Sequence, residues 1–78
     1  MLIDEMRLAF NTEEEQSRAW SIAQTAFKDQ DVIDNISLDS EVCWPGNLPR
    51  RRYIMTIYDA LGDEMAEFMR LCTLTSKT

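Results

Sequence analysis

The segment from Arg52 to Asp59 constrains the fold most, because its side chains are mainly apolar or aromatic on both faces of a strand. At period two they fall into two sets, with Tyr53, Met55 and Ile57 on one side and Ile54, Thr56 and Tyr58 on the other. Such a composition is typical of a strand that is central or covered on both sides. We therefore predict a sheet in which this strand has neighbours.

The residues before this segment predict an antiparallel partner for it. From Ile33 to Trp44 the pattern has period two, with Ile36, Leu38, Val42 and Trp44 on one side and Ser37, Asp39, Glu41 and Cys43 on the other. Residues 43–49 form the connection, because Pro45-Gly46 is strong turn chemistry and prolines cannot donate to a sheet ladder. The two strands are expected to form a hairpin, and the first of them has one face in water.

The N-terminal region predicts a strand and then a helix. Met6, Leu8 and Phe10 alternate within the segment from Glu5 to Phe10, although Leu2, Ile3, Met6 and Phe10 also fit a helical stripe. Thr12 and Glu15 then form a capping box, which indicates a helix start. Its apolar face extends to about Lys28 or Gln30 and consists of Ala19, Trp20, Ala23, Ala26 and Phe27.

A second amphipathic helix is predicted after the central strand. Its apolar stripe is formed by Leu61, Met65, Phe68, Met69 and Cys72, and its opposite side by Asp63, Glu64, Glu67 and Arg70. The tail from Thr73 to Thr78 is expected to be frayed. The whole chain, residues 1–78, is expected to form one domain, since it has no repeat and no linker rich in glycine or serine.

The resulting order, β-α-β-β-α, predicts a small α+β domain: a three-stranded, mostly antiparallel sheet with two helices on one face. This topology resembles a ferredoxin-like fold that lacks its last strand, a likeness that carries no functional information. It leaves one sheet face and one edge uncovered. Because a chain of 78 residues buries a limited core, a homodimer or larger assembly is expected to supplement it.

Composition argues against an enzyme. The chain has no histidine, so the commonest general base and metal ligand is missing, and Cys43 and Cys72 lack their usual activator. Gly46 and Gly62 stand alone, so no phosphate-binding glycine loop is present. We therefore expect no catalytic residue, no metal and no cofactor. A small-molecule sensor with a pocket between sheet and helices is the weakest of the functional hypotheses.

The charge distribution bears on partners and location. The net charge is −6, and residues 1–41 hold ten acidic and three basic side chains. A surface of this sign disfavours direct binding of nucleic acid or of an anionic membrane. Asp4 and Glu5 stand where a signal peptide would need positive charge, so a cytoplasmic protein with reduced cysteines is expected.

The acidic residues between the first helix and the hairpin form one candidate site. Asp31, Asp34, Asp39 and Glu41 could imitate phosphates and occupy the basic groove of a nucleic-acid-binding protein. A merely solubilising face is the alternative. The spacing that begins at Asp29 does not form a calcium loop, because the sixth and twelfth positions hold Asp34 and Ser40 in place of glycine and glutamate.

The second candidate site lies around the hairpin connection. Arg50, Arg51 and Arg52 are suited to contacts with carboxylates or phosphates, or else they deter pairing at an exposed strand edge. Trp44 is expected to fold back and close the bottom of the core, and the alternative is an exposed apolar knob with Leu48. An apolar interface would use Trp44, Leu48, Ile54 and Tyr58.

Together these features predict a small acidic protein-binding module: an inhibitor or adaptor that engages a nucleic-acid-handling protein. In size and charge the chain is similar to the inhibitors that phages and mobile elements direct at host machinery. The rival hypothesis is a structural or assembly protein that forms homo-oligomers through its uncovered sheet face or edge.

Overall fold

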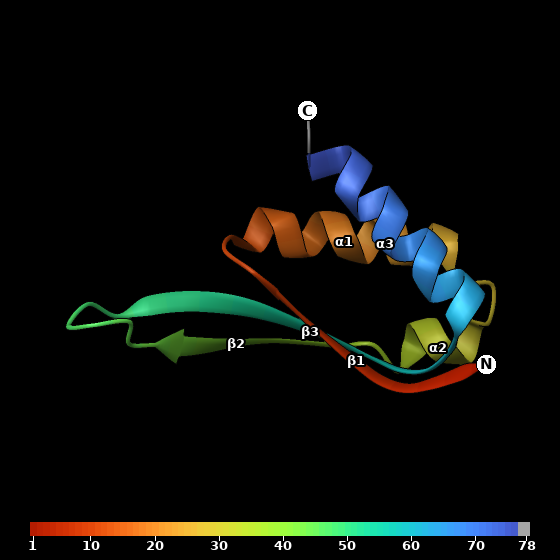
Figure 1. The fold of residues 1–78 in the computed structure, drawn as a ribbon, viewed down its shortest axis with the longest axis horizontal. Helices are drawn as coiled ribbons and strands as arrows, with labels where there is room; N and C mark the ends of the chain where they lie inside the picture. Colours follow the sequence, from red (N-terminus) through yellow and green to blue (C-terminus); the bar gives the residue numbers. More distant parts are fainter. Residues whose placement is uncertain (77–78) are drawn as a thin grey trace.

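In the computed structural model, which describes residues 1–76, the chain is a mixed α+β domain (Figure 1). Its elements are β1 (Leu2–Phe10), α1 (Glu13–Ala26), α2 (Gln30–Asp34), β2 (Ser37–Cys43), β3 (Arg50–Leu61) and α3 (Gly62–Ser76). This confirms the predicted fold class and adds one short helix. Of the tail that was expected to be frayed, residues 73–76 belong to α3, and residues 77–78 lie outside the described residues.

The strands form one antiparallel sheet in the order β1-β3-β2, with β3 in the centre as predicted. Met6 faces Ile57 across β1 and β3, and Leu38 faces Met55 across β2 and β3. The first and second strands in sequence are therefore separated by the third, as in a split β-α-β arrangement. Both outer edges, on β1 and on β2, lack a partner strand within residues 1–76.

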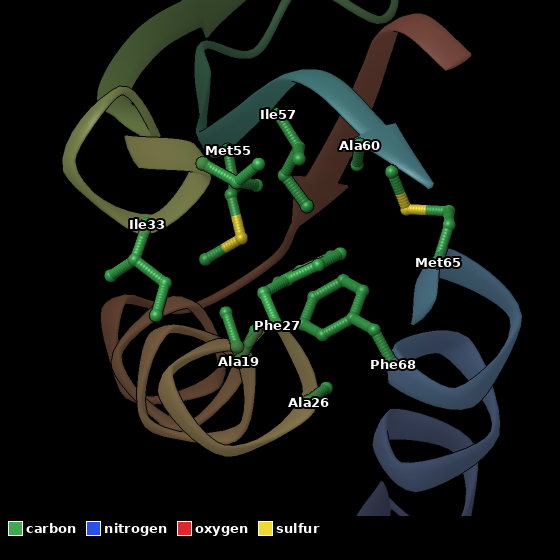
Figure 2. Close-up of a cluster of buried hydrophobic side chains, with 11 residues drawn as sticks. Ala19, Ala26, Phe27, Ile33, Met55, Ile57, Ala60, Met65 and Phe68 are labelled. Carbon is green, nitrogen blue, oxygen red and sulfur yellow. The ribbon is translucent and has the colours of Figure 1, made fainter. Parts of the chain in front are cut away.

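Helices α1 and α3 lie on the same face of the sheet, as predicted (Figure 1). Met55 and Ile57 point from β3 toward Phe27 and Phe68, and all four side chains are fully buried (Figure 2). The rings of Phe27 and Phe68 are 5.4 Å apart and tilted, a favourable arrangement for two aromatic side chains. The core is thus centred between α1, α3 and the middle of β3.

Helix α1 begins where the capping signal predicts. The side chain of Thr12 accepts a hydrogen bond from the backbone N–H of Glu15 at 3.2 Å, and the helix ends at Ala26. Ala19 and Ala23 are almost completely buried, whereas Trp20 is only half-buried. Small side chains on the inner stripe let α1 lie close to the sheet and to α3.

Helix α2 corrects one prediction, because the period-two pattern does not begin at Ile33. Asp29 caps a short helix by accepting a hydrogen bond from the N–H of Asp31 at 2.9 Å. Val32 and Ile33 then pack into the core, and β2 starts at Ser37. Two adjacent apolar residues fit a helical turn that follows a cap as well as they fit a strand, so periodicity alone misplaced this boundary.

The end of β3 contains a backbone kink that the alternation of β3 does not predict. Asp59 has a φ of 54°, in the left-handed region that aspartate tolerates better than most residues. Ile57 and Ala60 consequently both face the core, although they are three residues apart. The pairing register with β1 is unchanged across the kink, since Ile3 faces Ala60 and Met6 faces Ile57.

The molecule is elongated because the β2–β3 hairpin extends past the helices (Figure 1). The Cα radius of gyration is 13.2 Å, against about 11.5 Å for a compact domain of this length. The longest dimension is 41 Å. We call residues 42–52 the hairpin arm; none of them is buried. No helix within residues 1–76 has the length and apolar character needed to cross a membrane.

Candidate functional site

The sheet face that the helices leave uncovered is polar, and we call it the open face. It comprises Glu5 and Arg7 on β1, Ser37, Asp39 and Glu41 on β2, and Ile54, Thr56 and Tyr58 on β3. These residues line a shallow hollow of about 250 Å³. Within this hollow the carboxylates of Glu5, Asp39 and Glu41 outnumber the guanidinium group of Arg7, so its charge suits a basic partner better than a polyanion.

An ion pair spans the open face. Arg7 on β1 donates to the carboxylate of Glu41 on β2 at 3.2 Å, across the intervening strand β3. Ile54 and Thr56 belong to β3 on this face and are nonetheless buried. Because no helix within residues 1–76 covers this face, the flanking side chains of β1 and β2 must shield them. This is how β3 is covered on both sides, as its composition predicts.

The hairpin arm presents large apolar side chains to solvent. Trp44 is 66% exposed and Leu48 is 74% exposed, so the expectation that Trp44 closes the core is wrong. The core ends near Tyr53, and the arm continues beyond it, where no helix of the described part of the chain covers Trp44. Gly46 has a φ of 72°, which fits the turn that Pro45 and Gly46 predict, and the Trp44–Pro45 peptide bond is trans.

The three arginines do not share one face of the arm. Arg50 faces Cys43 and Arg52 faces Glu41 across the hairpin, whereas Arg51 faces Val42. Arg51 donates to the hydroxyl of Ser40 at 3.1 Å. Alternation along β3 therefore places Arg50 and Arg52 together and Arg51 on the opposite side.

Arg50 and Arg52 border a cleft at the end of the arm. Its lining is formed by Cys43, Trp44, Pro45, Arg50 and Arg52, and its volume is about 310 Å³. Neither of these two arginines makes an ion pair within residues 1–76. The arm thus combines a free pair of guanidinium groups with an exposed indole.

The structure distributes the nine predicted site residues over three places. Trp44, Arg50, Arg51 and Arg52 lie on the hairpin arm, Asp39, Glu41 and Tyr58 on the open face, and Asp31 and Asp34 on α2. Helix α2 lies at the opposite end of the molecule from the arm (Figure 1). The arginines and the α2 carboxylates are therefore separate surfaces.

Local hydrogen bonds account for part of the acidic segment. Asp29 caps α2, and Asp34 accepts a hydrogen bond from the side chain of Gln30 at 2.9 Å. Within the part of the chain that the structure describes, no three histidine, cysteine or acidic side chains lie close enough to hold a metal ion. These carboxylates remain exposed and contribute negative charge to the surface.

A small hollow near Cys72 lies between α1, the end of β1 and α3. Its lining includes Phe10, Ala19, Ile22 and Cys72, and its volume is about 50 Å³, far below the roughly 300–1,000 Å³ of typical small-molecule pockets. Burial raises the pKa of the Cys72 thiol, so its reactive thiolate is suppressed at neutral pH.

Arg7 and Gln16 are the residues with specific roles that sequence reasoning missed. Arg7 alternates with the apolar residues of β1, so the sequence pattern could have predicted that it lies on the open face. Gln16 is buried and donates to the backbone carbonyl oxygens of Ile54 at 2.8 Å and Asp39 at 3.0 Å. Its partners are 23 and 38 residues away in sequence, so no local pattern reveals them.

Comparisons of the chain with family models, with curated proteins and with solved structures find no match in any of the three.

Proposed function

We propose that this chain is a protein-binding module, an inhibitor or adaptor, whose main anchor is the hairpin arm. The observation that carries the proposal is the exposure of Trp44 and Leu48 on an arm that extends past the helices, beside three arginines. Tryptophan and arginine are the residues most enriched at the energetic centres of protein interfaces. Burial against a partner would remove this apolar surface from water.

The class of partner follows from charge. The chain carries a net charge of −6, and the open face adds Glu5, Asp39 and Glu41 around a single ion pair. We propose a nucleic-acid-handling protein as the partner, because a basic groove built for phosphates would attract this negative surface. The arm, as the main anchor, would then bind beside that groove.

Site-specific cross-linking tests the arm as the anchor. Benzoylphenylalanine replaces Trp44 in one variant and Gln24, an exposed residue of α1, in a matched control. In cells that express the chain naturally, the variant at position 44 should capture one defined protein on illumination, and the control should not. Equal capture from both positions, or capture from neither, would contradict the proposal.

A salt series tests the charge of the partner. Replacing Asp31, Asp34, Asp39 and Glu41 by asparagine or glutamine should weaken binding and flatten its dependence on salt, since exposed charges act over about 8–10 Å at physiological ionic strength. If the captured protein binds the variant with these replacements as tightly as the unchanged chain, the partner has no basic groove for this surface. The arm would then be the anchor by itself.

Self-assembly is the second candidate function, and the exposed edge of β2 favours it. Strand β2 has no partner on its outer side within residues 1–76. Leu38 and Val42 lie on the same face of this strand, and each is about half-exposed. An unprotected edge of this kind is a template for pairing with a second copy. Light scattering should then give a dimeric mass that Leu38→Lys reduces to a monomer. A monomeric mass that concentration does not change would rule this candidate out.

A further inference from the structure

We infer that the cleft between Trp44, Arg50 and Arg52 is a receptor for an extended, acidic segment of a partner protein. The inference rests on the proposed function and names the chemistry that the arm recognises. It predicts two carboxylates spaced two residues apart in the partner, with an apolar side chain next to them.

The geometry of the strand sets the spacing. Arg50 and Arg52 lie two residues apart on the same face of β3, opposite Cys43 and Glu41. Their Cα atoms are therefore about 7 Å apart, which is also the separation of alternate residues in an extended peptide. Carboxylates at alternate positions of such a peptide would each meet one guanidinium group.

Both guanidinium groups are available for a partner. Glu41 faces Arg52 in the hairpin, but its carboxylate is paired with Arg7 on β1. Arg50 faces Cys43, which offers no charge. Arginine presents a planar fork of N–H donors that binds a carboxylate through two parallel hydrogen bonds, so each arginine can fix one acidic side chain in position.

The wall of the cleft explains the apolar part of the predicted segment. Trp44 and Pro45 line the cleft beside the two arginines, and most of the surface of Trp44 is exposed. An aliphatic or aromatic side chain next to the carboxylates would cover this surface, and shielding from water would strengthen the adjacent ion pairs.

Charge and spacing favour a protein segment over the other candidates. A nucleic acid would bring a continuous run of phosphates close to a chain with a net charge of −6, whereas a segment with two carboxylates would place its charge against the two arginines alone. A second copy of this chain fits less well. Its alternate carboxylates on a strand are Asp39 and Glu41, and Glu41 is paired with Arg7; Glu13–Glu15 lie on a helix and diverge.

Peptide binding tests the inference directly. The probe is a fluorescein-labelled peptide, Ser-Leu-Glu-Thr-Glu-Leu-Ser, and its control carries glutamine in place of both glutamates. At physiological salt the glutamate peptide should bind and shift the indole N–H resonance of Trp44, and the resonance of Trp20, which belongs to α1, should stay unchanged. The glutamine peptide should not bind.

The hairpin provides a matched control among its own arginines. The double variant R50A/R52A should weaken binding about tenfold for each arginine removed, since each loses a charge-assisted hydrogen-bond pair. R51A should change the affinity less than about threefold, because Arg51 lies on the other face and its charge is screened. Thermal melts should be alike, since all three side chains are exposed.

Four results would overturn the inference: no binding of the glutamate peptide at millimolar concentration, equal losses for R50A/R52A and R51A, tighter binding of a single-stranded oligonucleotide, or a dimer that R50A/R52A dissociates. The inference and the proposed function can fail independently of each other. If position 44 captures a partner whose affinity R50A/R52A leaves intact, the module stands and its contact is apolar. If the peptide binds but position 44 captures nothing, the cleft stands without the module.

Discussion

The two halves of strand β3 differ sharply in how far their side chains are buried. Met55 and Ile57 are completely buried under α1 and α3 (Figure 2), whereas Arg50, Arg51 and Arg52 on the same strand are all exposed. The covered end supplies the packing that holds the fold together. The arm contributes little to this packing, so its surface can change without loss of the fold.

Gln16 lies at the boundary between these two regions. It extends from the first turns of α1 to the backbone of both hairpin strands, where it bonds to the carbonyl oxygens of Ile54 and Asp39. Beyond this point none of the helices that the structure describes lies above the hairpin. The contrast between a stabilising end and a free arm leads to four predictions about stability, from the largest effect to the smallest.

Phe68→Ala should have the largest effect. Phe68 is fully buried and contacts the ring of Phe27 at the centre of the core. Its truncation should cost about 3–5 kcal/mol, a large part of the roughly 5–15 kcal/mol that stabilises a typical domain. Urea denaturation measures the loss. Met69→Ala, at an exposed residue of the same helix, is the control. Equal losses of stability in Phe68→Ala and Met69→Ala would show that burial under the helices does not concentrate the stabilising contacts.

Gln16→Ala should cost less, about 1–3 kcal/mol, because buried carbonyl oxygens lose their donor. Gln24→Ala on the exposed side of the same helix is the control and should be nearly silent. Hydrogen exchange sharpens the comparison. Amides of the hairpin near Asp39 and Ile54 should exchange faster in Gln16→Ala, and those of α3 should change only as far as global stability falls.

Asp59→Val should destabilise the domain by about 1–2 kcal/mol, since a β-branched residue is strained at a φ in the left-handed region. Asp59→Gly should not show this loss, because glycine adopts that conformation without strain. Denaturant melts of the pair check the role of the kink in turning Ala60 into the core. Equal melts for the two variants would show that the backbone there relaxes freely.

Trp44→Ala should have the smallest effect on folding, within about 0.5 kcal/mol, as expected for a surface position. Trp44 is 66% exposed, so truncation removes few contacts inside the molecule. Thermal unfolding followed by far-ultraviolet circular dichroism measures this directly. A loss as large as that of Phe68→Ala would show that the arm folds back onto the core in solution.

Sequence patterns were reliable where the structure depends on neighbouring residues. The capping signal at Thr12 placed the start of α1, and the apolar character of both faces of β3 placed that strand in the centre of the sheet. The short helix α2 was missed because five residues hold too few turns for a helical period to stand out.

The candidate site was predictable as residue types and not as an arrangement. Arg50, Arg51, Arg52 and Trp44 were candidate partner-binding residues from the sequence, yet only the pairing of β2 with β3 separates Arg51 from the other two arginines. The exposure of Trp44 was not predictable, because the hydrophobicity of a tryptophan does not reveal whether a helix lies above it.

By itself, the amino-acid sequence determined the α+β class, the central strand, the helix cap and the acidic charge, because each follows from spacing along the chain or from composition. The tertiary structure alone decided how far the helices cover the sheet. Helix α1 covers the sheet only as far as the region of Gln16, and this leaves the arm in solvent. The hydrogen-bond partners of Gln16 are 23 and 38 residues away in sequence. Contacts between residues so distant in sequence depend on how whole elements pack, which no local pattern encodes.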